Sequence, residues 1–153
     1  MGKYIKICIG IILSVIVVSC FTLIIYENVS ANKRDKIVLY YDNLTDYANL
    51  SQVEGVIVDI NYKYNKADTV KIIFTIESDK IYKLAFYTSK HYVGKYEAYI
   101  GSSALISYDT KKFGNSWDLP IFNIRIGTKS IISYSVAKWE LIEWIVINYS
   151  LSY

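Results

Sequence analysis

The residues best suited to binding chemistry lie in a polar stretch that runs from Asp109 to Asp118. Its candidates are two cations and two aromatic rings: Lys111, Lys112, Phe113 and Trp117. Aromatic rings beside cations on a loop can stack on bases or sugars, or insert into a protein partner. The structural alternative is that Trp117 folds back and closes one end of a β domain. The sequence therefore predicts a binding loop and leaves both roles of Trp117 open.

The chain offers little else for catalysis. His91 is its only histidine, and both cysteines precede residue 21, so a zinc site would lack its usual ligands. No Gly-x-Ser-x-Gly turn exists to hold the nucleophile of a Ser-His-Asp triad. The acidic pairs Asp109/Asp118 and Glu77/Asp79 could act on glycosides only at a defined separation, and such pairs are more often solvated turn residues. We expect no catalytic residue, no metal and no cofactor.

Charge argues against nucleic acid as a partner. The chain has 17 lysines and arginines against 14 aspartates and glutamates, and 15 against 13 remain beyond Ala31. This balance does not provide the basic surface that a nucleic-acid groove needs. Both cysteines, Cys8 and Cys20, precede this part of the chain, so it can form no disulfide.

An uncharged apolar run from Ile7 to Tyr26 precedes these candidates and must position them. About 20 apolar residues suffice for a helix to cross the hydrocarbon core of a bilayer. Its length favours an uncleaved anchor, with Tyr26 at the membrane interface. Residues 29–31 (Val-Ser-Ala) have the form of a signal-peptide cleavage site, which would free the body after Ala31. Residues 17–20 (Val-Val-Ser-Cys) resemble a bacterial lipobox, which would place a lipid on Cys20.

The orientation of this run depends on its flanking cations. Lys3 and Lys6 precede it, whereas Lys33, Arg34 and Lys36 follow it, so the rule that cations stay cytoplasmic is nearly balanced. The basic N-terminus followed by an apolar run resembles a signal peptide. This favours a cytoplasmic N-terminus and an extracytoplasmic location for the chain beyond Ala31. A cytosolic body is the alternative.

Beyond Ala31, the spacing of apolar residues changes once, from a helical period to strict alternation. Ile37, Tyr41 and Leu44 have helical spacing, which predicts a short helix that Asp42 and Asn43 interrupt. Strict alternation then begins, with one predicted buried face made of Val56, Val58, Ile60, Tyr62 and Tyr64. The predicted organisation is a signal-anchor or signal peptide, a tether with a short helix, and a small β domain: 1–31, 32–52 and 53–153.

Further alternating segments predict an antiparallel fold. Pro120 indicates that its strand begins at an edge of the sheet. The tail has no evident apolar face as a helix, so 145–153 is predicted as a strand after a helical turn over 136–141. Strands this frequent without long helices predict a small antiparallel β-barrel or sandwich of about five to seven strands. The other candidate strands are 70–76, 81–87, 96–100, 104–108, 119–126 and 130–134.

Several segments together resemble small, uncharacterised bacterial membrane-tethered or lipoprotein-like proteins with a compact β domain. The resemblance rests on the head through Cys20, on 53–57 (Val-Glu-Gly-Val-Ile), and on 99–103 (Tyr-Ile-Gly-Ser-Ser) leading to 106–108 (Ile-Ser-Tyr). It implies a cell-envelope location and a β fold, without a defined activity.

The function we expect is a non-enzymatic binding or structural module of the cell envelope. The membrane would hold it through the N-terminal helix, and an envelope protein could dock at an unpaired sheet edge. One alternative is a cytosol-facing barrel of the oligonucleotide-binding type that stacks single-stranded nucleic acid on Tyr62, Tyr64, Phe113 or Trp117. An envelope hydrolase is the other alternative, with less support.

Overall fold

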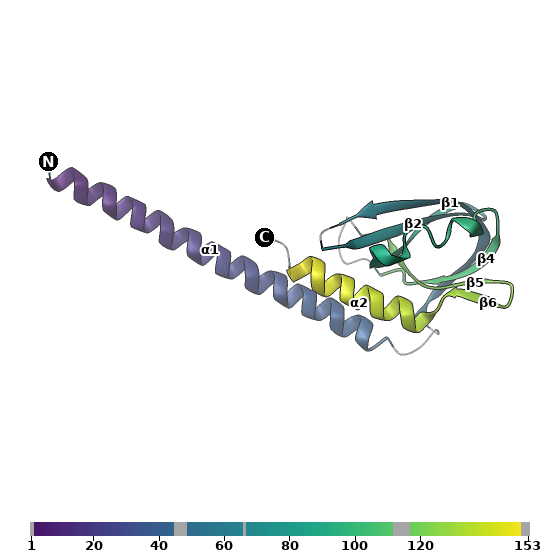
Figure 1. The fold of residues 1–153 in the computed structure, drawn as a ribbon. Coiled ribbons are helices and arrows are strands. Elements are labelled where there is room, and N and C mark those ends of the chain that lie inside the picture. Colours follow the sequence, from purple (N-terminus) through teal and green to yellow (C-terminus); the bar gives the residue numbers. More distant parts are fainter. Residues whose placement is uncertain (1, 45–48, 66, 112–116, 151–153) are drawn as a thin grey trace. The chain divides into compact units, whose positions relative to one another are not determined.

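The computed structural model describes residues 2–44, 49–65, 67–111 and 117–150 (Figure 1). The chain divides into two compact units, Met1–Lys36 and Ile37–Tyr153. Its elements in order are α1 (Gly2–Asp42), β1 (Ser51–Tyr64), β2 (Thr69–Glu77), β3 (Ile81–Ser89), the 3-10 helices η2 (Lys90–Tyr92) and η3 (Glu97–Tyr99), β4 (Ser103–Tyr108), β5 (Leu119–Ile126), β6 (Lys129–Ile132) and α2 (Tyr134–Ser150).

The first unit consists of α1 up to Lys36. From Ile9 to Val29 its large apolar side chains are 51–63% exposed. The hydroxyls of Ser14 and Thr22 return to helix carbonyls, donating to Gly10 O at 2.9 Å and to Val18 O at 3.1 Å. An apolar environment requires this internal satisfaction of polar groups. The helix is long and apolar enough to span a membrane or to act as a signal sequence.

Helix α1 is longer than the sequence predicts. The expected tether after Ala31 is helical, and α1 runs unbroken to Asp42. In the second unit, Ile37, Tyr41 and Leu44 are at most 6% exposed, as their helical spacing predicts. The helix ends at Asp42, where the sequence indicated an interruption. The possible cap at residues 45–46 lies outside the described residues.

The strands form one six-stranded sheet with the order β3-β2-β1-β4-β5-β6. Adjacent strands in this order are antiparallel, and a short parallel pairing of β3 with β5 completes a barrel-like ring of hydrogen bonds. The sequence prediction of a mainly antiparallel β domain after an apolar helix is confirmed. Pro120 does not mark an edge, because it pairs with Ala85 of β3. It is tolerated as the second residue of β5, near the start of the strand.

The predicted buried face of β1 is wrong in its first half and at its last residue, because Tyr64 is 57% exposed. Val56 and Val58 are 37% and 39% exposed, whereas Ile57 is completely buried. A β-bulge lies between Ile57 and Asp59, where β1 pairs with β2. The extra residue of a bulge reverses the side-chain alternation beyond it. Ile60 is therefore buried like Ile57, although three residues separate them.

Two other predicted elements differ from the structure. The segment 96–100 contains the 3-10 helix η3 rather than a strand. The tail forms helix α2 rather than a strand, and the last predicted strand positions, 151–153, lie outside the described residues. Ala137, Leu141 and Ile145 are at most 1% exposed and lie four residues apart, so they form one narrow buried stripe.

The second unit contains two hydrophobic clusters. The inner cluster lies chiefly within the ring of strands, with Phe74, Leu84 and Ile106 among its completely buried members. The outer cluster combines side chains of α2 and of the end of α1 with side chains of β3 and β5, and α2 contacts both strands. Its buried members are Ile37, Tyr41, Leu44, Ala85, Tyr87, Trp117, Phe122, Leu141 and Ile145.

Candidate binding pocket

A small pocket opens beside the outer cluster. Its volume is about 120 Å³, which exceeds the roughly 10–15 Å³ needed for one water molecule. Strands β1, β2 and β3 meet helix α2 and the segment before β5 around it. The lining residues are Lys63, Asn65, Lys71, Tyr87, Trp117 and Trp144.

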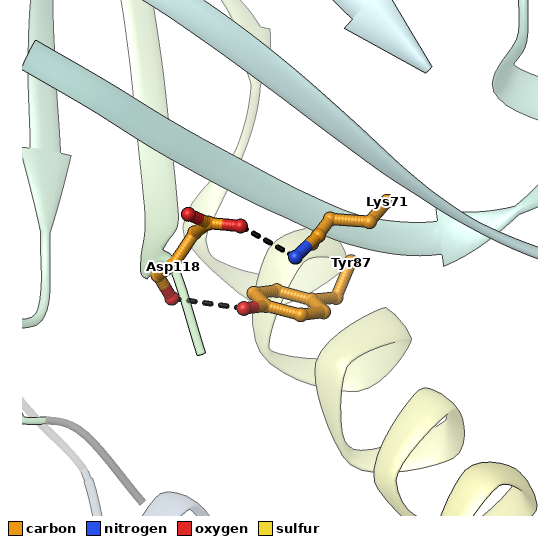
Figure 2. Close-up of polar contacts among 3 residues, drawn as sticks. All are labelled: Lys71, Tyr87 and Asp118. Atoms are coloured by element: carbon orange, nitrogen blue, oxygen red, sulfur yellow. Dashed lines mark hydrogen bonds and ion pairs between the residues drawn. The ribbon is translucent and has the colours of Figure 1, made fainter. Parts of the chain in front are cut away.

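One of the two lysines of this pocket, Lys71, is held by an ion pair. Lys71 Nζ lies 2.5 Å from Asp118 Oδ2, and Tyr87 donates its hydroxyl to Asp118 O at 2.8 Å (Figure 2). The Lys71 side chain is 8% exposed and that of Asp118 is 35% exposed. A buried ammonium requires such a partner, because desolvation of an unpaired charge is costly. The ion pair therefore keeps a cation inside the domain.

Tyr87 is a donor in this group and remains one over a wide pH range. Burial, followed by the negative charge of Asp118, raises the pKa of Tyr87 above its ordinary value. The phenol is therefore protonated at neutral pH and can donate to the Asp118 carbonyl. It has none of the character of a general base.

Aromatic rings form the apolar walls. The ring centroids of Tyr87 and Trp144 are 4.8 Å apart, and those of Tyr87 and Trp117 are 5.3 Å apart. Trp117 and Trp144 meet edge to face at 5.8 Å. Trp117 also donates its indole N–H to the Tyr149 hydroxyl at 3.2 Å. These contacts place an aromatic wall beside the ion pair of Lys71 and Asp118.

Two buried donors at the pocket have no acceptor among the described residues: Asn65 Nδ2 and Trp144 Nε1. Asn65 follows the last residue of β1, just before a turn in which Ala67 and Asp68 have φ values of 50° and 60°. An unsatisfied buried donor costs about 1–3 kcal/mol. Both atoms are buried from solvent even with the pocket empty, so they do not form its accessible surface.

The predicted binding loop is only partly present in this site. Trp117 is 7% exposed, so its ring forms a pocket wall rather than an exposed stacking surface. Lys111 is exposed and lies away from the lining, with its Nζ 3.6 Å from the Tyr40 ring centroid. Lys112 and Phe113 lie outside the described residues.

The other candidates from the sequence form no site. His91 belongs to η2, and its ring meets Tyr92 edge to face at 5.8 Å. Within the described ranges, no group of three or more His, Cys, Asp or Glu residues could hold a metal ion. Asp118 is paired with Lys71, whereas Asp109 accepts the backbone N–H of Lys111 at 3.0 Å. Asp79 accepts the Tyr82 hydroxyl at 3.1 Å.

Sequence reasoning missed most of this pocket. Lys71 alternates with apolar residues in β2, a pattern that predicts a solvent-facing side chain, and Trp144 lies just before the strand predicted over 145–153. The sequence of β3 did contain a signal for this site, because the neighbouring residues Phe86 and Tyr87 are both large and apolar. A strand that is apolar on both faces indicates a second covering layer.

Comparisons of the chain with protein-family models, with curated proteins and with solved structures found no match. The apolar helix and the pocket are therefore the features of this protein that bear on its function.

Proposed function

We propose that this protein is a non-enzymatic binding module that its N-terminal helix holds at a membrane. The observation that carries the proposal is a pocket of about 120 Å³ in a domain that follows a membrane-length apolar helix.

The lining supports binding rather than catalysis. It consists of two lysines, one asparagine and three aromatic residues, and it includes no histidine, cysteine or carboxylate among the described residues. General acid–base catalysis needs a group whose pKa lies near the working pH. Tyr87 is shifted away from that range, and His91 does not line the pocket.

We further propose that the β domain lies on the extracytoplasmic side and that the helix remains attached. The experiment is full-length expression in intact bacterial cells, followed by external protease treatment and by mass spectrometry of the purified chain. Degradation of the domain by external protease and an intact N-terminus are expected. Protection of the domain would contradict the proposed sidedness. A mass that begins at Asn32, or one with a lipid on Cys20, would replace the anchor with one of the two alternatives.

The nucleic-acid alternative has weaker support. Of its proposed stacking residues, Trp117 is buried, and the hydroxyl of Tyr62 donates to Glu97. Tyr64 is 57% exposed and could stack on a base. Measuring the binding of single-stranded oligonucleotides at two salt concentrations tests it. Salt-sensitive binding would favour the alternative.

A further inference from the structure

A second pocket lies on the outer face of the sheet, where β1, β4 and β5 are neighbours, and we call it the sheet-face pocket. Its volume is about 390 Å³, and small-molecule sites commonly measure about 300–1,000 Å³. It shares no lining residue with the pocket beside Lys71. Every lining residue is described, and none adjoins an undescribed residue in sequence: Glu54, Ser103, Ala104, Leu105, Arg125 and Gly127.

Strand pairing places the two charged residues of the sheet-face pocket on opposite sides of one apolar residue. Leu105 of β4 pairs with Glu54 of β1 on one side and with Arg125 of β5 on the other. Residues paired in this way point to the same face of a sheet. That face is the outer one, because Ala104 and Ile106, which flank Leu105, are 2% and 0% exposed. Half-buried Leu105 therefore lies between an exposed carboxylate and an exposed guanidinium.

Both charged side chains are available to a ligand. Within the ranges that the structure describes, neither Glu54 nor Arg125 forms an ion pair. Glu77 is exposed at the end of β2, beside β1, and adds a negative charge on the Glu54 side. Lys129 instead donates to the Tyr99 hydroxyl at 3.4 Å. The sheet-face pocket is thus negative towards β1 and positive at β5.

The spacing of the strands sets the length of a matching ligand. Two strand spacings separate the Cα atoms of Glu54 and Arg125 by about 10 Å. A charge-assisted hydrogen bond takes up about 2.8 Å at each end, which leaves about 4–5 Å between the two charged groups of a bridging ligand. A single amino acid holds its ammonium and carboxylate about 2.5 Å apart, whereas an extended dipeptide spans at most about 7 Å. A dipeptide therefore fits this gap better.

We propose that the sheet-face pocket binds a short zwitterion of dipeptide length, with its ammonium at Glu54 and its carboxylate at Arg125. A guanidinium binds a carboxylate through two parallel hydrogen bonds, and a carboxylate accepts from an ammonium. Between these ends, the Ser103 hydroxyl can pair with the peptide amide, and Leu105 contacts apolar atoms. Because a single exposed ion pair contributes little, recognition requires both ends at once. This site lies beyond the proposed function and does not depend on it.

The test uses the full-length chain in an uncharged maltoside detergent, with the leucine methyl groups labelled by carbon-13. Dialanine is titrated while the methyl resonances are recorded. We expect a saturable shift of the Leu105 resonances, with those of Leu141, which is 1% exposed, as the internal reference. N-acetyl-dialanine, dialanine amide and free alanine should each bind about fivefold more weakly, because each loses one ion pair.

Three outcomes would overturn the proposal. The first is no saturable shift of Leu105 with dialanine. The second is equal affinity for a peptide that is blocked at either end, or for free alanine, because charge and length would then play no role. The third is tighter binding of glycerophosphoethanolamine than of dialanine, which would replace the carboxylate with the phosphate of a lipid headgroup.

Two variants assign the ends of the ligand. Glu54→Gln should bind dialanine no better than N-acetyl-dialanine, and Arg125→Gln should bind dialanine no better than dialanine amide. Both positions are exposed, so neither change should disturb folding. Glu143→Gln, at an exposed position of α2, is the matched control and should keep the full preference for dialanine. A preference that survives in Glu54→Gln or in Arg125→Gln would contradict the assigned contact. Such a result would leave the membrane-held module intact, since protease treatment and mass spectrometry test that module separately.

Discussion

The inner and outer clusters of the β domain differ in how completely they satisfy their polar atoms. The inner cluster lies chiefly within the strands and holds completely buried apolar side chains such as Phe74 and Ile106. The outer cluster lies under two helices and adjoins a buried lysine and a pocket. In the described ranges, the unpaired buried donors of Asn65 and Trp144 belong to the outer side.

This difference separates stability from function. Close-packed side chains within the ring of strands lose contacts and leave a cavity when they are truncated. The outer layer is formed by helix α2 against β3 and β5, and a pocket of about 120 Å³ adjoins it. Sites of binding commonly retain groups that would be better satisfied with a ligand present. We expect changes in the inner cluster to affect folding and changes at the pocket to affect binding.

The largest effect is expected for Phe74→Ala in the inner cluster. Phe74 is completely buried and meets Tyr96 with their ring centroids 5.7 Å apart. Its truncation should lower the free energy of unfolding by about 3–5 kcal/mol. Chemical unfolding of the full chain measures this loss. Ile81→Ala is the control, because Ile81 is 68% exposed and its change should stay within about 0.5 kcal/mol. Equal losses of unfolding free energy in the two variants would contradict the expectation that the inner cluster determines stability.

An intermediate effect is expected where helix α2 is fixed to β3. Glu140 accepts the Thr88 hydroxyl at 2.6 Å and the Ser89 N–H at 3.3 Å. Glu140→Ala leaves the Thr88 hydroxyl, on a residue that is 1% exposed, without this acceptor. The expected loss of stability is about 1.5–3 kcal/mol, measured by chemical unfolding. Glu143→Ala, at an exposed position of the same helix, should change stability by less than about 0.5 kcal/mol. A similar loss in both variants would show that the helix, rather than this contact, is sensitive.

The smallest effect is expected at Tyr62, whose hydroxyl donates to Glu97. This hydrogen bond holds the pKa of Glu97 below its ordinary value of 4.5, so its contribution to stability is present above that value and is lost as the pH falls through the folded-state pKa. Burial, and next the bond to Glu97, raise the pKa of Tyr62 from 10.0 to about 12. That contribution is complete below 10.0 and is lost as the pH rises towards 12.

Tyr62→Phe should therefore flatten the dependence of the unfolding midpoint on pH at both ends of the range. Because Glu97 is almost fully exposed, the change at low pH should be small. Thermal unfolding across acid and alkaline pH measures it. Tyr64→Phe on the same strand is the control for the acid limb and should leave that limb unchanged. An unchanged profile in Tyr62→Phe would show that this contact does not contribute to stability.

Prediction from the sequence succeeded where a short pattern determines an element. The apolar run, the helical spacing of Ile37 and Tyr41, and the strand over 70–76 were all predicted correctly. It failed at Val56 and Val58, because a bulge inserts one residue against β2 and no local signal marked it. It also failed in the tail, where the buried stripe of α2 consists of only three residues, Ala137, Leu141 and Ile145.

The sequence by itself determined an apolar helix of membrane length, a β domain without cysteines, and most of the residues that bury themselves in its strands. Each of these depends on residues that are close in the chain, or on composition alone. The tertiary structure decided that β3 closes against β5, that the tail covers β3 as a helix, and that Asn65, Lys71 and Trp144 face one pocket. These outcomes depend on contacts between segments that are distant in sequence. Hydrophobic periodicity indicates which face of a segment is buried, but it does not indicate which other segment packs against that face.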